Sequence, residues 1–248
     1  MPASPWTLAG DKAILKRPGI SAELDLKRPG LGLHNLKVAG QCWEAARLLG
    51  VTWGDASDQP HAVSDGYVRG EDLIATYAEE ARRPFAPQVY WRVGNPPPPA
   101  DGGAGLQIEL LVSVQTQVLD AEPRMTALSA VRASEFLYLE DEAAGRFAAL
   151  EPGTDLPPSA ACLLVRLADS PLSYVEMVHP RDFNPGHLSV AQSGENWTIR
   201  HTLIACRMEK GVIIRVRLRG GIVPRSRDVD AAAGLYEAFS HAALPLSA

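Results

Sequence analysis

The sequence predicts an all-β protein, a large antiparallel β-sandwich with one short C-terminal helix. Twenty prolines and 21 glycines separate short apolar segments, which indicates many turns. Apolar and polar residues alternate in several of these segments, as expected for half-buried strands. With 248 residues and 46% hydrophobic content, the chain can bury a sizeable core. We therefore expect a single sandwich domain over residues 1–248, with a Pro/Gly-rich loop at 95–105.

The strands expected before this loop follow from alternation and turn residues. In Ser21–Leu26, apolar residues alternate with charged ones. Residues 41–49 fit either a helix or a strand with Trp43 inward. A hairpin is expected over Asp65–Tyr77, turning at Gly70-Glu71. The other predicted strands are Ala13–Leu15, Leu31–Val38 and Gln88–Val93.

After the loop the alternation is sharper. Residues 106–115 place five apolar side chains on one face, which predicts a long half-buried strand. A shorter strand is expected over Glu135–Glu140. Two hairpins are predicted, one formed by residues 161–167 and 173–179 and the other by 197–208 and 212–218. The final segment repeats apolar residues at helical spacing from Asp228, a candidate N-cap, to about His241.

Strand richness, chain length and one late helix together resemble the supersandwich of galactose mutarotase-like proteins. The resemblance is architectural, since no stretch aligns with the mutarotase catalytic motif. It implies a carbohydrate-active protein, either a sugar epimerase or a domain that binds acidic glycans. Fold alone does not establish function.

Composition favours a soluble cytoplasmic protein. Three widely spaced cysteines (Cys42, Cys162 and Cys206) predict no disulfide framework and fit a reducing compartment. The N-terminus has no signal-peptide pattern, and no apolar stretch is long enough to span a membrane. Motifs for phosphate loops, a serine nucleophile or zinc are missing, so we expect no cofactor and no metal. The net charge of −5 argues against nucleic acid as a partner.

Positive charge is concentrated near the C-terminus, where residues 200–227 hold eight basic residues and one acidic residue. Within this region Arg215, Arg217 and Arg219 share one face of a predicted strand. Arginines bind carboxylates, phosphates and sulfates, so an anionic ligand such as a uronic acid would fit. The alternatives are ion pairs with Glu109 or Glu176 across the sheet, or solvation.

A second candidate is the loop His179–His187, which contains Asp182. Its histidines, with Asp182 or Glu176, have the chemistry for metal binding or for acid–base catalysis. The spacing matches no known metal motif. The alternative is a surface loop whose Asp and Asn stabilise turns.

A third candidate combines Trp197, His201, Arg207 and Glu209. His201 and Glu209 face the same way but are eight residues apart, about 26 Å along a strand. They therefore cannot act on one substrate atom, although His201 can meet an acid from a neighbouring strand.

A fourth candidate lies at the turn of the 65–77 hairpin, where Trp91 and Arg92 of the following strand are expected nearby. Aromatic and polar side chains together suit the face of a sugar ring. The alternative is a charged strand edge that prevents aggregation.

The chain contains no recognisable catalytic motif, so a binding or structural module is the first functional prediction. A carbohydrate-active protein is the alternative. In both cases the expected partner is a carbohydrate or another small anion.

Overall fold

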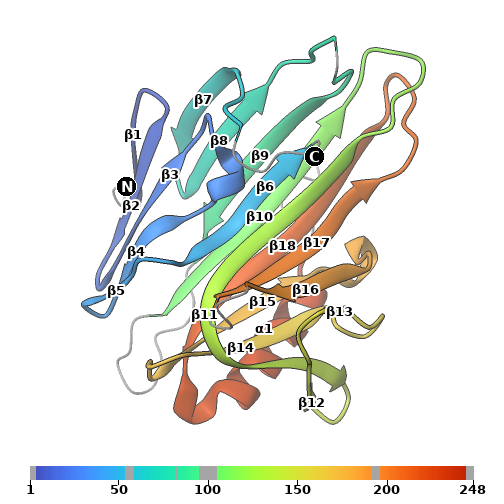
Figure 1. Cartoon of the computed structure of the whole chain (residues 1–248). Helices are drawn as coiled ribbons and strands as arrows, with labels where there is room; N and C mark the ends of the chain where they lie inside the picture. Colours follow the sequence, from blue (N-terminus) through green and yellow to red (C-terminus); the bar gives the residue numbers. More distant parts are fainter. Residues whose placement is uncertain (1–3, 54–58, 82, 95–104, 192–195, 244–248) are drawn as a thin grey trace.

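The computed structural model describes residues 4–53, 59–81, 83–94, 105–191 and 196–243. Within these ranges the regular structure is almost all antiparallel strand, arranged in two sheets, with one α-helix near the C-terminus (Figure 1). The predicted all-β fold with a C-terminal helix is therefore confirmed. The Pro/Gly-rich segment predicted as a loop lies outside the described residues from 95 to 104.

The smaller sheet is a meander in which each strand pairs with the next along the chain. Along its second strand, Ala13 and Leu15 are buried while Ile14 and Lys16 are exposed. The strand predicted over Leu31–Val38 begins later, because proline and glycine residues first form the 3-10 turn η1 (Pro29–Leu31). The strands are β1 (Trp6–Ala9), β2 (Lys12–Arg17), β3 (Ile20–Asp25), β4 (His34–Val38) and β5 (Gln41–Trp43).

The larger sheet has thirteen strands in the order β13-β16-β17-β11-β14-β15-β18-β10-β9-β8-β7, with β6 and β12 also paired to β11. The hairpins predicted over 65–77 and 161–179 are confirmed as β7–β8 and β14–β15. The strands are β6 (Arg47–Trp53), β7 (Val63–Arg69), β8 (Asp72–Tyr77), β9 (Ala86–Val93), β10 (Leu106–Gln115), β11 (Arg124–Asp141), β12 (Arg146–Ala149), β13 (Thr154–Asp155), β14 (Cys162–Leu167), β15 (Leu172–Val178), β16 (Gly186–Val190), β17 (Asn196–Ala205) and β18 (Ile213–Pro224).

Strand β11 is far longer than the Glu135–Glu140 strand predicted from the sequence. It has 18 residues and appears in Figure 1 as a long curved green strand. Its first half pairs with β6 and β17, and its second half pairs with β12 and β14. The prediction was too short because the buried face of the first half carries the polar Ser129 and the small Ala127 and Ala133, so its apolar signal is weak.

The hairpin predicted from residues 197–208 and 212–218 is wrong. Strand β17 pairs with β11 and β16, whereas β18 pairs with β10 and β15. The glycine-containing turn is present, because Val212 N–H donates to the Glu209 carbonyl. Yet Met208 forms a bridge with Ala121, which directs the chain away from β17. The two strands therefore alternate as predicted but belong to different parts of the sheet.

Helix α1 (Asp228–Ser240) confirms the predicted C-terminal helix. It covers β14, β15 and β18, and Phe239, Tyr236 and Ala232 fill a small core beneath it. Asp228 does not cap the helix as predicted, because it is the first helical residue. Its carboxylate instead accepts hydrogen bonds from Arg166 and Ser173, which fastens the start of α1 to the sheet. Two short 3-10 turns, η2 (Pro180–Asp182) and η3 (Arg225–Arg227), complete the regular structure.

The main core lies between the two sheets. It includes Leu15 and Leu24 from the small sheet and Trp91, Leu110 and Leu163 from the large one. The small sheet is also fastened by polar contacts, because the Tyr77 hydroxyl donates to the Leu26 carbonyl at 2.7 Å. Of the three free thiols, Cys162 is buried, whereas Cys42 and Cys206 are exposed.

Candidate functional site

Four polar side chains meet inside the main core, and we call them the polar cluster: Ser129 of β11, Tyr174 and Glu176 of β15, and His201 of β17. The Glu176 carboxylate accepts hydrogen bonds from the hydroxyls of Tyr174, at 2.6 Å, and Ser129. Its Oε1 lies 2.9 Å from His201 Nε2, close enough for an ion pair but not aligned for a hydrogen bond. Each side chain is at most 1% exposed. His201 therefore meets an acid, but from a strand that is not its neighbour.

The polar cluster supports a strained backbone position. Leu49 of β6 has φ of 56°, where β6 loses register against β11. Such a conformation is unfavourable for a residue with a side chain and needs support from its surroundings. The Leu49 N–H donates to Ser129 Oγ at 3.0 Å, and its carbonyl accepts from the Trp91 indole at 3.2 Å. Ser129 thus links the carboxylate to the backbone of β6.

Within the described part of the chain, the polar cluster is tightly enclosed. A Cβ atom on Gly220, which lies opposite Glu176, would come within 2.8 Å of the Tyr174 hydroxyl. The void beside Tyr174 and Gly220 measures about 10 Å³, roughly the space of one water molecule. Burial, reinforced by the negative charge of Glu176, raises the pKa of Tyr174 well above its usual range. Tyr174 therefore remains a protonated donor, and the polar cluster joins β11, β15 and β17 inside the core.

The predicted arginine stripe does occupy one face of β18. Arg219 lies opposite Glu109 of β10, and their side chains form an ion pair of 2.6 Å. Glu109 was one of the two acidic partners considered from the sequence. The other, Glu176, lies on the opposite face, in the polar cluster. Arg215 lies at the exposed end of the stripe.

The row of charges continues across the large sheet. Arg92 of β9 lies opposite Glu109 and also opposite Asp72 of β8. Two hydrogen bonds of 2.6 and 2.9 Å join the Arg92 guanidinium to the Asp72 carboxylate. Arg92 is thus near the 65–77 hairpin, as expected, whereas Trp91 points into the main core and is fully buried.

Arg217 is 1% exposed and connects the large sheet to the end of α1. Its guanidinium donates to the carbonyls of Ala243 and Ala242 at 3.1 and 3.2 Å. Its backbone N–H donates to the Asp182 carboxylate at 3.0 Å. Arg217 and Asp182, which were predicted as site residues in separate segments, therefore meet here.

His179 belongs to the same region. Its ring stands edge-on to Phe239 of α1, with centroids 5.6 Å apart. Burial and the nearby Arg217 charge lower the pKa of His179, whereas burial raises the pKa of Asp182. The structure thus places His179, Asp182, Arg217 and Arg219 around the C-terminal end of α1.

The remaining predicted residues lie elsewhere. Arg207 forms an exposed ion pair with Asp120, at 2.6 Å, and His187 pairs with Asp155 at 3.0 Å. His201 and Trp91 are in the main core. Among the described residues, no group of three or more His, Cys, Asp or Glu side chains is placed to hold a metal ion.

A hollow that was not predicted from the sequence lies between the two sheets, and we call it the inter-sheet groove. It measures about 550 Å³, within the usual range of ligand sites. Trp43 lines it, is half-buried and packs against the main core, which agrees with the strand interpretation of this segment. The tryptophan in the segment of residues 41–49 was the one local signal in the sequence. The polar lining residues are Gln41, Glu44, Arg132, Asp169 and Ser170.

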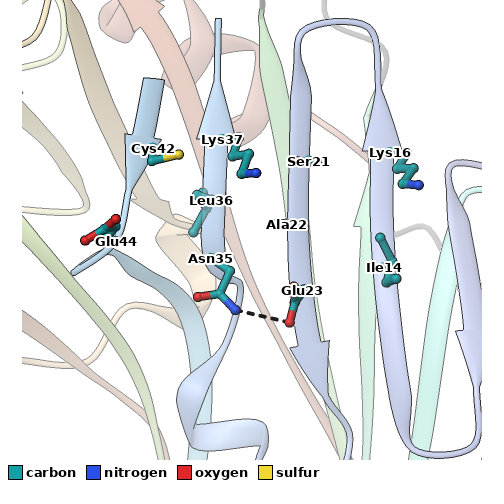
Figure 2. A pocket seen from close by; sticks show the side chains of 10 residues that line it. All are labelled: Ile14, Lys16, Ser21, Ala22, Glu23, Asn35, Leu36, Lys37, Cys42 and Glu44. Carbon is teal, nitrogen blue, oxygen red and sulfur yellow. Dashed lines mark hydrogen bonds between the residues drawn. The ribbon is translucent and has the colours of Figure 1, made fainter. Parts of the chain in front are cut away.

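A second hollow of about 500 Å³ lies on the solvent face of the small sheet (Figure 2). Lys16 and Lys37 project from strands on either side of Ser21, and Asn35 donates to Glu23 at 3.1 Å. This hollow shares Cys42 and Glu44 with the inter-sheet groove. The two hollows therefore meet at the edge strand β5, but only the inter-sheet groove has an aromatic lining residue.

A third hollow, the arginine pocket, measures about 270 Å³ and lies beside the end of α1. Its lining residues are Arg92, Gly94, Gln107, Glu109, Arg217, Arg219, Ala242 and Ala243.

Comparison with known proteins identifies the fold. No family model matches the sequence, and no curated protein matches it. A galactose mutarotase-like protein from Lactobacillus casei superposes with a TM-score of 0.58 at 10% identity, covering 85% of this chain and 99% of that one. A galactose mutarotase related enzyme from Lactobacillus acidophilus gives a TM-score of 0.52 at 7% identity, with coverage of 86% and 98%. The fold is therefore galactose mutarotase-like.

The part of the chain that the structure describes contains no helix of the length and apolar character needed to cross a membrane.

Proposed function

We propose that this protein binds carbohydrate in the inter-sheet groove and does not transform it. The groove itself carries the proposal, because it places the Trp43 indole beside carboxylates, an amide and a guanidinium. A sugar ring has an apolar C–H face that can lie on an aromatic ring. Its hydroxyls donate to carboxylates and accept from guanidinium and amide groups.

The fold supports this choice of ligand class. The similar solved structures are described as galactose mutarotase-like, and a groove between sheets is a common position for a small-molecule site. Arg132 and Asp169 face the groove from different elements and lie 3.7 Å apart as an exposed ion pair. They offer a donor and an acceptor that a sugar hydroxyl pair can bridge.

Binding without turnover follows from where the acid–base groups lie. The close Glu176–His201 pair resembles a general acid–base pair in composition, yet it is sealed in the core. A catalytic group must come within hydrogen-bond reach of the proton it transfers. The four residues of the polar cluster are not among the described residues that line the inter-sheet groove.

Isothermal titration with D-galactose, D-glucose and their disaccharides tests the proposal. We expect at least one of these sugars to bind wild-type protein and Trp43→Ala to weaken its binding by about tenfold or more, or roughly 1.4 kcal/mol. Tyr67→Ala is the matched control, because Tyr67 is an exposed aromatic residue on β7 that does not line the groove. Equal affinity in wild type and Trp43→Ala, or no binding of any sugar, would refute the proposal.

Polarimetry of freshly dissolved α-D-galactose separates binding from catalysis. We expect the protein to leave the rate of mutarotation unchanged. A rate enhancement that disappears in Glu176→Gln would instead show that the core opens and that the polar cluster is catalytic.

We also propose that the protein resides in a reducing compartment such as the cytoplasm. It rests on three free cysteines, two of them exposed.

A further inference from the structure

The arginine pocket contains two buried polar atoms that the protein leaves without partners. Arg217 Nε and Glu109 Oε1 have no hydrogen-bond partner among the described residues. Arg217 is 1% exposed and Glu109 7% exposed, and both line the pocket. Burying a polar group without a hydrogen-bond partner costs free energy, so these two atoms indicate a site for a hydrogen-bonding ligand.

The two atoms differ in what they need. Arg217 Nε is a donor and requires an acceptor, whereas the Glu109 carboxylate requires a donor. Arg217 Nη1 and Glu109 Oε1 are 4.0 Å apart, too far for a direct hydrogen bond. A ligand that satisfies both must carry an acceptor and a donor close together.

The charges around the pocket favour an anion. Arg92, Arg217 and Arg219 line the pocket beside one carboxylate, Glu109. Asp72 pairs with Arg92 but also with Arg69, so positive charge remains in excess. Arg181 and Asp182 also interact electrostatically with Arg217, but their opposite charges add no net charge. Burial lowers the pKa of Arg217, since Glu109 and Asp182 do not fully offset the loss of water and the repulsion from Arg219.

The pocket is held rigidly. The guanidinium carbon of Arg219 lies 4.5 Å from the centre of the Phe239 ring, and that of Arg217 lies 5.5 Å from it. Carbonyls at the end of α1 fix the other two nitrogens of Arg217. Such positioning lowers the entropy that binding would otherwise cost.

We propose that the arginine pocket binds a small hydroxycarboxylate, such as a sugar acid. Its carboxylate accepts hydrogen bonds from Arg217 and Arg219, and a neighbouring hydroxyl donates to Glu109. The ligand's negative charge offsets part of the excess positive charge. This site is separate from the inter-sheet groove, and its ligand does not depend on the carbohydrate proposal.

Titration calorimetry with D-gluconate and D-glucuronate tests the assignment, with acetate, phosphate and D-glucose as comparison ligands. Acetate and phosphate lack the carbon-bound hydroxyl, and glucose lacks the carboxylate. We expect a sugar acid to bind at least about tenfold more tightly than any of the three. Equal binding of acetate or phosphate would reduce the site to general anion binding and overturn the proposal, as would no binding of either sugar acid.

Two variants locate the site. The double variant Arg219→Met with Glu109→Gln removes both members of one ion pair together, and Gln107→Trp fills the pocket. We expect each to weaken sugar-acid binding by about tenfold or more. Arg215→Met is the matched control, because it removes a charge from the same strand face outside the pocket. A loss of binding in Arg215→Met equal to that in the double variant would contradict the assignment.

The Trp43→Ala protein distinguishes this proposal from the first. If sugar acids still bind Trp43→Ala with wild-type affinity, the arginine pocket is independent of the groove. If their binding is lost there and kept in the pocket variants, the groove is the site and the arginine pocket assignment fails.

Discussion

Glu176 is a charged residue at the centre of a hydrophobic core, and its neighbours explain how it is tolerated. Removing a carboxylate from water costs several kcal/mol unless hydrogen bonds and an opposite charge compensate. Tyr174 and Ser129 supply two donors, and His201 supplies a basic group at 2.9 Å. The polar cluster is therefore a connection among β6, β11, β15 and β17, and its loss should be felt as instability.

Ser129→Ala tests this connection. The substitution removes one donor to Glu176 and the acceptor of the Leu49 N–H, which stays buried in a strained conformation. We expect the free energy of unfolding to fall by about 1–3 kcal/mol, measured by urea denaturation. Ser64→Ala is the control, since this exposed hydroxyl only donates to the Thr76 carbonyl, and we expect a change within about 0.5 kcal/mol. Equal stability of the two variants would show that the polar cluster contributes nothing.

At the residue scale, part of this could be read from the sequence. The acid in the apolar run Leu172–Val178 indicates a buried charge, and its alternation with Tyr174 and Val178 places all three on one face. Its partners Ser129 and His201 come from strands distant in sequence. No local sequence pattern indicates which distant strands bring their side chains together in the core, so the polar cluster could not be predicted.

Among the elements, regular alternation decided which strands could be predicted. Strand β10 alternates without interruption and was predicted with its observed bounds, whereas β11 contains several small and polar residues and was recognised only in part. The β17–β18 connection has the local signature of a hairpin, but long-range pairing with β11 and β10 determines where each strand lies. Turn chemistry fixes the turn and does not fix the pairing.

Two glycines in neighbouring elements should respond in opposite ways to alanine. Gly220 of β18 has no space for a Cβ, which would lie 2.8 Å from Tyr174 Oη and 3.1 Å from Leu49 Cδ1. We expect Gly220→Ala to lower the free energy of unfolding by about 1–3 kcal/mol. Gly234 is exposed in the middle of α1 with nothing within 4 Å of a Cβ. Gly234→Ala should therefore raise stability by about 0.5–1 kcal/mol through helix propensity.

Thermal denaturation of both variants beside wild type makes the comparison. A destabilised Gly234→Ala would mean that α1 needs flexibility at this point. An unaffected Gly220→Ala would mean that the core around Tyr174 is looser than the contacts indicate.

The whole molecule consists of two sheets that enclose one main core. Because this core is enclosed, the fold does not by itself establish the chemistry that the resemblance implies. The resemblance to mutarotase-like proteins was predictable from strand richness, length and the late helix, and the solved structures bear it out. Which face is covered was not predictable, because it depends on how the small sheet lies against β6, β7 and β8. The polar residues that the sequence suggested were therefore distributed between the sealed core and the surface.

Closure also determines how the molecule responds to acid. The His61 ring packs against two aromatic side chains. Its centroid lies 4.4 Å from that of Trp53 and 6.3 Å from that of Tyr77. Burial, helped by the charge of Arg83, lowers the pKa of His61, and burial with Arg217 lowers that of His179. In the unfolded chain both would titrate near 6.5. The unfolded state then binds more protons below that pH, so stability is complete above about 6.5 and falls as the pH decreases.

The substitution His61→Phe isolates one of these contributions, because it retains an aromatic ring against Trp53 and Tyr77 while removing the titrating nitrogens. We expect the melting temperature of wild type to fall between pH 7.5 and pH 5, and that of His61→Phe to fall less. Both proteins should share a further loss below about pH 3.8, where the lowered pKa values of Asp25 and Asp228 bring those carboxylates into play. Parallel curves for the two proteins between pH 7.5 and pH 5 would show that His61 stays as accessible to protons in the folded state as in the unfolded chain.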